Sequence, residues 1–240
     1  MPAAQRAGAG RAPAVQRLSV QTAEHALTEL VYARYLAALL DGDRARCAAI
    51  VEELRAADVG LRDLYVHLFQ RALYEVGDLW EHQRISVAVE HLATAITERL
   101  LTLVHAQVFS GPSRERSIII ACVGSEYHQL GGRMVADLCE LQGWRGYFLG
   151  AATPVPDLLQ MIEEHRPDMV GLSLSIYFNM AALLDALDAV TAAYPELPIL
   201  VGGQAFRWAG LPGAVPAYRN VSLIASLDEL EQRLAAHGAG

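Results

Sequence analysis

The stretch "ACVGSEYHQLGGRMV", residues 121–135, decides the fold of the second half of this 240-residue chain. Apolar residues typical of a strand run into a glycine loop, and the loop leads into a stretch with helical periodicity. Glu126 and His128 stand in that loop. A strand followed by a glycine loop and a helix is the first unit of an α/β domain, and such domains bind ligands beyond the carboxyl ends of their strands.

Short apolar runs recur after residue 117, and amphipathic stretches separate them. Such runs are typical of parallel strands that are buried on both faces. The runs are SIIIACV (117–123), GYFLG (146–150), DMVGLSL (168–174), PILVGG (198–203) and VSLIA (221–225). Their alternation with helices predicts a Rossmann-like, flavodoxin-like domain over residues 117–240, with a five-stranded parallel sheet.

The pattern before residue 110 is helical instead. Apolar residues at steps of three and four predict one buried face of a first helix. These residues are Leu27, Leu30, Val31, Tyr35 and Leu39. A turn at Gly42 with a cap at Asp43, a third helix ending near Gly77 and a cap at Ser86 complete the pattern. Residues 20–110 therefore form a predicted four-helix bundle, and residues 1–19 a predicted disordered tail.

The composition excludes several classes of function. A net charge of −8 argues against nucleic-acid binding by the chain itself, because that binding depends on neutralising phosphates. Cys47, Cys122 and Cys139 lack the spacing of a metal site and are expected to be buried thiols in a reducing compartment. Neither a membrane-spanning run nor a signal-peptide core is present, so the sequence predicts a soluble cytoplasmic protein without a membrane partner.

The residues of the glycine loop leave two interpretations open. A phosphate loop is excluded because the spacing is not G-x-G-x-x-G, and a nucleophile at Ser125 is excluded because "VGSEY" lacks the second glycine of the elbow. A zinc site would need further ligands at suitable spacing. The loop is then either an ordinary turn whose polar residues face water, or the place of a single-histidine metal ligand at His128.

The second interpretation is supported by a resemblance. The E-x-H-x-x-G pattern at residues 126–131 is similar to the D-x-H-x-x-G of cobalamin-binding domains. In that family a serine follows 41 residues later and a glycine pair a further 26 to 28 residues on. Here Ser173 follows after 41 residues, and Gly202 and Gly203 follow 26 residues after Ser175. The family's S-x-L is S-x-S here, and Ser175 makes the expected pocket more polar.

The resemblance implies roles for these residues. His128 binds cobalt in place of the cofactor's own benzimidazole, and Glu126 holds the second ring nitrogen and raises its basicity. The displaced nucleotide tail enters the sheet domain, where Ser173 hydrogen-bonds it. Glycines leave room for that tail, and they are Gly131, Gly202 and Gly203.

The helical half resembles two branches of cobalamin proteins, corrinoid methyl carriers and light-sensing adenosylcobalamin regulators of the CarH type. The regulators carry Trp, nine residues and then Glu-His, and this chain has Trp80, nine residues and then Glu90 and His91. The resemblance implies that Trp80 packs against the adenosyl group and that the other two hydrogen-bond around it. On the residues alone, Trp80 also fits an ordinary core position, and Glu90 with His91 fits a solvated first helical turn.

Two departures from the CarH type shape the expectation. Those regulators begin with a helix-turn-helix domain where this chain has its tail, so direct DNA binding is not expected. Their histidine after the tryptophan is Glu81 here, and the nearest histidine is His82. The missing histidine leaves room on the cap side of the cobalamin, and related sensors, the photocobilins, hold a bilin in that room. His82, Tyr65 and Arg84 are the residues here that fit such a space, so a noncovalent bilin such as biliverdin is a candidate second chromophore.

The sequence thus predicts a sensor, not an enzyme. It is expected to hold adenosylcobalamin base-off/His-on between the helical cap and the α/β domain, and to signal when light breaks the cobalt–carbon bond. The signal would pass through a homo-oligomer or a separate effector protein. A corrinoid methyl carrier of a methyltransferase system is the main alternative, and a cobalamin carrier or storage protein is another.

Overall fold

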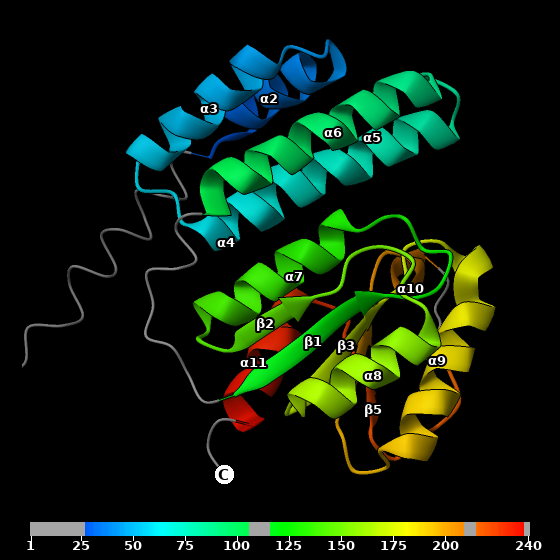
Figure 1. The fold of residues 1–240 in the computed structure, drawn as a ribbon. Coiled ribbons are helices and arrows are strands. Elements are labelled where there is room, and N and C mark those ends of the chain that lie inside the picture. Colours follow the sequence, from blue (N-terminus) through cyan, green and yellow to red (C-terminus); the bar gives the residue numbers. More distant parts are fainter. Residues whose placement is uncertain (1–26, 106–115, 209–214, 238–240) are drawn as a thin grey trace, which may run out of the picture. The chain divides into compact units, whose positions relative to one another are not determined.

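The structure is a computed structural model, and it describes residues 27–105, 116–208 and 215–237 (Figure 1). The chain divides into two compact units, Met1–Val104 and His105–Gly240. The first unit is helical and the second is built on a sheet, as Figure 1 shows. The predicted tail, residues 1–19, lies outside the described residues.

The described part of the first unit consists of helices joined by short turns. They are α2 (Glu29–Leu40), α3 (Arg44–Ala56), the consecutive segments α4 (Leu61–Asp63), η1 (Leu64–Gln70, a π-helix) and α5 (Arg71–Glu81), and α6 (Val87–Val104). Asp43 caps α3 by accepting a hydrogen bond from the amide of Arg46 at 3.0 Å, and Gly42 before it has a φ of 70°. Both features agree with the predicted turn. Ser86 Oγ likewise accepts from the amide of Val89, at 3.4 Å.

Two details of the helical prediction are wrong. Leu30 is 73% exposed, and α2 instead buries Tyr32, Tyr35, Ala38 and Leu39. Each residue turns a helix by about 100°, so Leu30 lies roughly 200° away from Tyr32 and faces outward. The third helix also continues through Gly77 to Glu81, because a single glycine weakens a helix by only about 1 kcal/mol and does not stop it.

The second unit confirms the predicted parallel sheet. Its strands are β1 (Ser117–Cys122), β2 (Arg145–Phe148), β3 (Met169–Ser173), β4 (Ile199–Gly202) and β5 (Val221–Leu223). They form a five-stranded sheet in the order β2-β1-β3-β4-β5, and every neighbouring pair is parallel. This is the flavodoxin-like order. The connecting helices are α7 (Leu130–Leu141), α8 (Val155–His165), α9 (Met180–Ala193), α10 (Ala205–Trp208) and α11 (Leu227–His237).

Strand β1 supplies the core on both faces of the sheet. Ile118 and Ile120 pack into a cluster with residues of α7 and α11, whereas Ile119 and Ala121 pack into a second cluster with residues of α8 and α9. Figure 1 shows these helix pairs on opposite faces of the sheet. The alternation follows from the two-residue period of a strand, and it explains why the strand reads as a continuous apolar run.

The strand register places the motif residues in one row. Cys122 pairs with Ser173, and Ser173 pairs with Gly202, so the last residues of β1, β3 and β4 are direct neighbours. The loop carrying Glu126 and His128 begins immediately beyond this row. Segments far apart in the sequence therefore meet at the carboxyl edge of the sheet.

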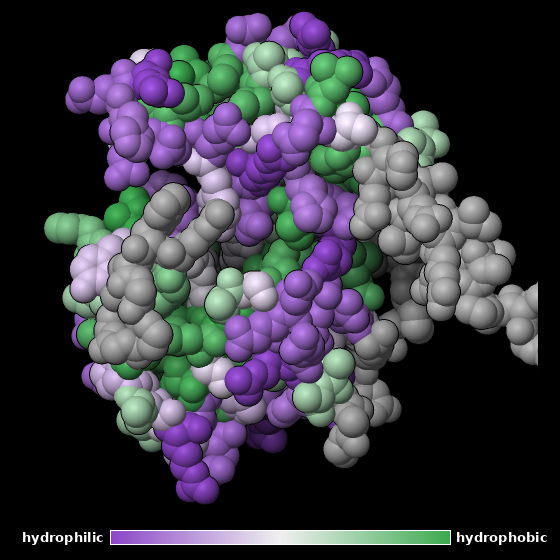
Figure 2. All heavy atoms as spheres, turned by 180° about the vertical axis from the view of Figure 1, so that it is seen from behind, coloured by the Kyte–Doolittle hydropathy of each residue, from purple (hydrophilic) through white to green (hydrophobic). Residues whose placement is uncertain are grey.

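The remaining expectations concern the surface and the thiols. The face drawn in Figure 2 carries many hydrophilic residues with apolar ones between them. Among the described residues, no helix combines the length and the apolar character needed to cross a membrane. Cys47, Cys122 and Cys139 are unpaired and buried, as predicted.

Candidate functional site

A buried carboxylate lies at the centre of the β1–α7 loop. Glu126 has no exposed surface although its side chain is charged. The loop turns tightly before it, because Ser125 adopts a φ of 64° and the amide of Glu126 donates to the carbonyl of Val123 at 2.9 Å. This turn directs the side chain inward. A buried charge is tolerated only where hydrogen bonds replace the lost water.

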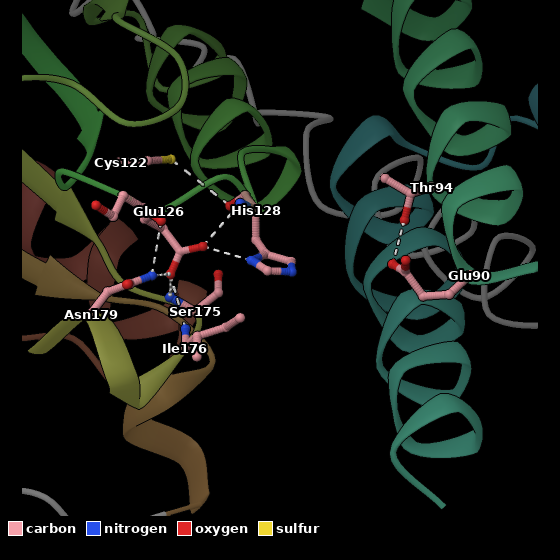
Figure 3. A network of polar contacts seen from close by, with 9 residues as sticks. Glu90, Thr94, Cys122, Glu126, His128, Ser175, Ile176 and Asn179 are labelled. Atoms are coloured by element: carbon pink, nitrogen blue, oxygen red, sulfur yellow. Dashed lines mark hydrogen bonds and ion pairs between the residues drawn. The ribbon is translucent and has the colours of Figure 1, made fainter. Parts of the chain in front are cut away.

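Glu126 receives those hydrogen bonds from two loops (Figure 3). Its Oε1 accepts from the backbone amide of His128 at 2.9 Å and contacts His128 Nδ1 at 2.6 Å. Its Oε2 accepts from the amides of Ser175 and Ile176 at 2.9 and 3.0 Å, and from Asn179 Nδ2 at 3.3 Å. One carboxylate therefore joins the loop after β1 to the loop after β3.

The same contacts fix the charge of Glu126. Burial alone would raise its pKa, but the hydrogen bonds from His128, Ile176 and Ser175 outweigh burial and lower the pKa to about 2. Glu126 is therefore ionised at neutral pH and can only accept hydrogen bonds. His128 must then donate from Nδ1, and Nε2 becomes the ring nitrogen suited to bind a metal.

The histidine is presented to the outside while its carboxylate partner is hidden. The side chain of His128 is 55% exposed. Within the described ranges, no group of three or more His, Cys, Asp or Glu side chains could hold a metal ion. A metal at His128 would need its other ligands from a cofactor, as in proteins that hold a metal macrocycle by one axial histidine.

The glycines test whether a cofactor fits beside His128. A Cβ built on Gly131 meets no other atom within 4 Å, so nothing in the described chain excludes a side chain there. A group from outside the chain would explain that glycine. Gly203 differs, because its φ is 119° and a Cβ would lie 2.1 Å from the carbonyl oxygen of Leu174. The backbone itself requires glycine at 203. The space at Gly202 is intermediate, because a Cβ there would lie 3.4 Å from the carbonyl oxygen of Ile224.

The two serines occupy different places. Ser173 ends β3 in the row between Cys122 and Gly202. Ser175 contacts Glu126 through its backbone amide. A leucine at 175 would offer the same amide, so the departure from S-x-L leaves the Glu126 network intact.

The helical unit carries the other predicted residues. Trp80 on α5 is 48% exposed, which excludes the ordinary core position. On α6 the side chain of His91 is 74% exposed and that of Glu90 only 20%. Glu90 Oε1 accepts a hydrogen bond from Thr94 Oγ1 at 3.0 Å, as Figure 3 shows, and its Oε2 lies 3.5 Å from His91 Nε2.

The residues expected around a bilin differ in exposure, because Tyr65 is fully buried whereas His82 and Arg84 are exposed. Tyr65 has no exposed surface and packs against Phe69 in the core, with ring centroids 6.1 Å apart. Its expected place beside an open space is wrong, because Tyr65 belongs to the buried side of η1. His82 is exposed and its Nδ1 lies 2.8 Å from the carbonyl of Asp78. Arg84 is exposed as well.

Sequence reasoning missed Asn179 and Thr94. Asn179 follows β3 by six residues and donates to both Glu126 Oε2 and the carbonyl of Ser125, at 3.3 and 3.2 Å. A single asparagine before a helix gives no signal of this contact. Thr94 stands four residues after Glu90, a spacing that places two side chains on the same helix face and could have revealed the pair.

These features define a class of domain. A doubly wound sheet presents one histidine at its carboxyl edge, orients it by a buried carboxylate and leaves space at Gly131, which fits a metal cofactor held by a single axial ligand.

Known proteins identify the family. A B12 binding domain matches residues 116–215, and a second B12 binding domain matches residues 31–104. The chain therefore belongs to the B12-binding proteins that join a helical B12 binding domain to an α/β one, and it is CarH-like.

The relatives of this chain include both transcriptional repressors and corrinoid proteins. The HTH-type transcriptional repressor CarH of Myxococcus xanthus is 33% identical over 72% of this chain, which spans 57% of that protein's length. Trimethylamine corrinoid protein 1 of Methanosarcina acetivorans is 21% identical over 78% of the chain and 89% of that protein. Among solved structures, the Methanosarcina barkeri monomethylamine corrinoid protein has the same fold, with a TM-score of 0.71, 16% identity and coverage of 87% of this chain and 99% of that one.

Proposed function

We propose that this chain is a cobalamin-dependent light sensor that regulates a partner or its own assembly. The observation that carries the proposal is the pair formed by His128 and the buried Glu126, which prepares one imidazole nitrogen for a metal. The family provides the cofactor, and the likeness to CarH supports a regulator over an enzyme.

His128 is proposed to bind the lower face of cobalamin, with the cofactor base-off. Glu126 keeps the proton on Nδ1, so Nε2 offers its lone pair to the metal. The row of Ser173 and Gly202 and the space at Gly131 are proposed to receive the displaced tail. Cobalamin itself supplies a cobalt–carbon bond that light can break.

The upper group is proposed to be adenosyl, held by residues of the helical unit. Trp80 exposes an aromatic surface that can pack against an adenine ring. Glu90 is fixed by Thr94 and retains acceptor capacity for hydroxyl groups of a ribose. His91 lies beside it and provides a second polar group.

Loss of the adenosyl group is proposed to be the signal. A bound adenosyl group stabilises the conformation that encloses it. When the group is lost, the equilibrium shifts toward the other conformation by the difference between the two binding free energies. The output is then a change in self-association or in the binding of a separate protein. Because Tyr65 lies in the core, the proposal is confined to cobalamin and does not include a bilin.

A corrinoid methyl carrier is the second candidate. The match to trimethylamine corrinoid protein 1 favours it, because that match covers 89% of the relative whereas the match to CarH covers 57%. A carrier needs an upper face that a methyltransferase can reach. The exposed Trp80 and the Glu90 held by Thr94 favour the sensor, since such side chains can select a large upper group.

The deciding experiment illuminates the protein loaded with adenosylcobalamin and follows its mass by light scattering. The sensor predicts tighter binding of adenosylcobalamin than methylcobalamin, and a change in mass or shape under green light. Equal affinity for both forms with an unchanged mass would reject the sensor. Methyl turnover with an added methyltransferase would then support the carrier.

A further inference from the structure

The loop that follows β2 is tied closely to the loop of His128. The amide of Ala152 donates to the carbonyl of Glu126 at 2.8 Å, and the amide of Thr153 donates to the carbonyl of Cys122 at 3.0 Å. The carbonyl of Gly150 accepts from the amide of Cys122 at 3.1 Å. Residues 150–153 are thus held against the β1–α7 loop by main-chain hydrogen bonds.

The backbone of this loop is strained where it turns. Ala152 adopts a φ of 48°, a left-handed conformation that costs free energy for a residue with a Cβ. Strain of this kind persists only where the surroundings impose it. The next residue, Thr153, is buried beside the end of β1, where its amide donates to the carbonyl of Cys122.

Thr153 has a buried hydroxyl that lacks a partner. The residue is 8% exposed, and its Oγ1 makes no hydrogen bond with any other part of the chain that the structure describes. A buried hydroxyl without a partner destabilises a protein, and a valine of the same shape would avoid the cost. An apolar residue would therefore serve the fold better at this position.

We propose that Thr153 is a cofactor-binding residue whose hydroxyl donates to an amide carbonyl oxygen at the edge of the corrin ring. The inference rests on the proposed binding of cobalamin at His128. Threonine rotates about χ1 between more than one favoured conformer, so the hydroxyl can turn from its buried position toward a group bound above the loop.

The sheet order decides which part of the cofactor Thr153 meets. Strand β2 lies on one side of β1, whereas β3 and β4, with Ser173 and Gly202, lie on the other. The tail is assigned to the side of β3 and β4. Thr153 follows β2 and flanks the His128 loop on the opposite side, which leaves the corrin ring as its neighbour.

The test measures stability and affinity in the same variants. Thr153→Val should raise the Tm of the cofactor-free protein by about 2–4 °C, because it removes an unsatisfied group. The same variant should bind cobalamin about 3- to 10-fold more weakly, because it removes one hydrogen bond. Thr153→Ser, which retains the hydroxyl, should keep the wild-type affinity within about twofold.

If the hydroxyl of Thr153 only stabilises the fold, Thr153→Val should lower the Tm and leave the affinity for cobalamin unchanged. A lower Tm for Thr153→Val, failure of that variant to fold, or unchanged affinity would overturn the inference while wild-type binding through His128 still stands. Cobinamide, which has the corrin ring but no nucleotide tail, should lose the same factor in Thr153→Val. A loss seen with cobalamin alone would contradict the assignment to the ring. If the wild-type protein binds no cobalamin, the proposed function fails as well.

Discussion

His128 Nδ1 lies 2.6 Å from Oε1 of the fully buried Glu126, while the other carboxylate oxygen accepts from the amides of Ser175 and Ile176. The direction of the imidazole therefore depends on two loops, one after β1 and one after β3. Because the carboxylate accepts hydrogen bonds from both loops, a change in either loop would alter the orientation of the imidazole and of the Nε2 atom offered to the metal.

Replacing the carboxylate by its amide should weaken cobalamin binding. In Glu126→Gln the side chain carries one acceptor oxygen where the wild type has two, so the contacts with His128 and with Ser175 and Ile176 cannot all persist. The affinity should fall about 10- to 100-fold, as is typical when the partner of a ligating histidine is lost. Isothermal titration with Glu163→Gln, an exposed change on α8, as control would measure it. Equal affinity in both variants would refute the role of Glu126.

The two glycines nearest the site should respond in opposite ways to alanine. Gly131→Ala should change the free energy of unfolding by less than about 1 kcal/mol, because its Cβ has room, yet it should weaken cobalamin binding. Gly203→Ala should destabilise the cofactor-free protein, since its φ of 119° and its closeness to Leu174 leave no space. Urea unfolding and cofactor titration separate the two effects. A Gly131→Ala variant that binds normally would argue against a cofactor at that position.

The upper-face residues should control which cobalamin is preferred. Trp80→Ala should reduce the preference for adenosylcobalamin over methylcobalamin, and Thr94→Val should do so more weakly by releasing Glu90. Val87→Ala truncates an apolar side chain of the same unit that is exposed to the same degree, 49% against 48% for Trp80, and is the control. Competition between the two cofactors gives the ratio of affinities. An unchanged ratio in Trp80→Ala would exclude contact with the upper group.

The three cysteines should not react in the folded protein. Burial raises the pKa of Cys47 to about 11 and those of Cys122 and Cys139 to about 12, so almost no thiolate forms at pH 8. A thiol reagent should label them only after unfolding in denaturant. Rapid labelling of the native protein would contradict the buried positions.

Much of this arrangement could be predicted from sequence patterns. The apolar runs such as SIIIACV predicted the parallel sheet because a doubly buried strand has no polar alternation. The spacing of His128 and Ser173 predicted residues at neighbouring strand ends. The contact of Glu126 with Asn179 could not be predicted, because it depends on how the loop after β3 turns. Leu30 was misplaced because periodicity indicates a helix face without fixing which residues at its edge are buried. Tyr65 was misplaced because its residue type fits a polar pocket as well as a core, and only the packing of η1 shows that it is buried.

The most direct test of cobalamin binding through His128 is the absorption spectrum of the protein with adenosylcobalamin. We predict a base-off spectrum with histidine bound in the wild type, and loss of binding or a base-off spectrum without histidine in His128→Ala. His67→Ala, a similarly exposed histidine of the helical unit, should retain the wild-type spectrum. If His128→Ala binds with the same spectrum and affinity as the wild type, His128 is not the ligand and the account is wrong.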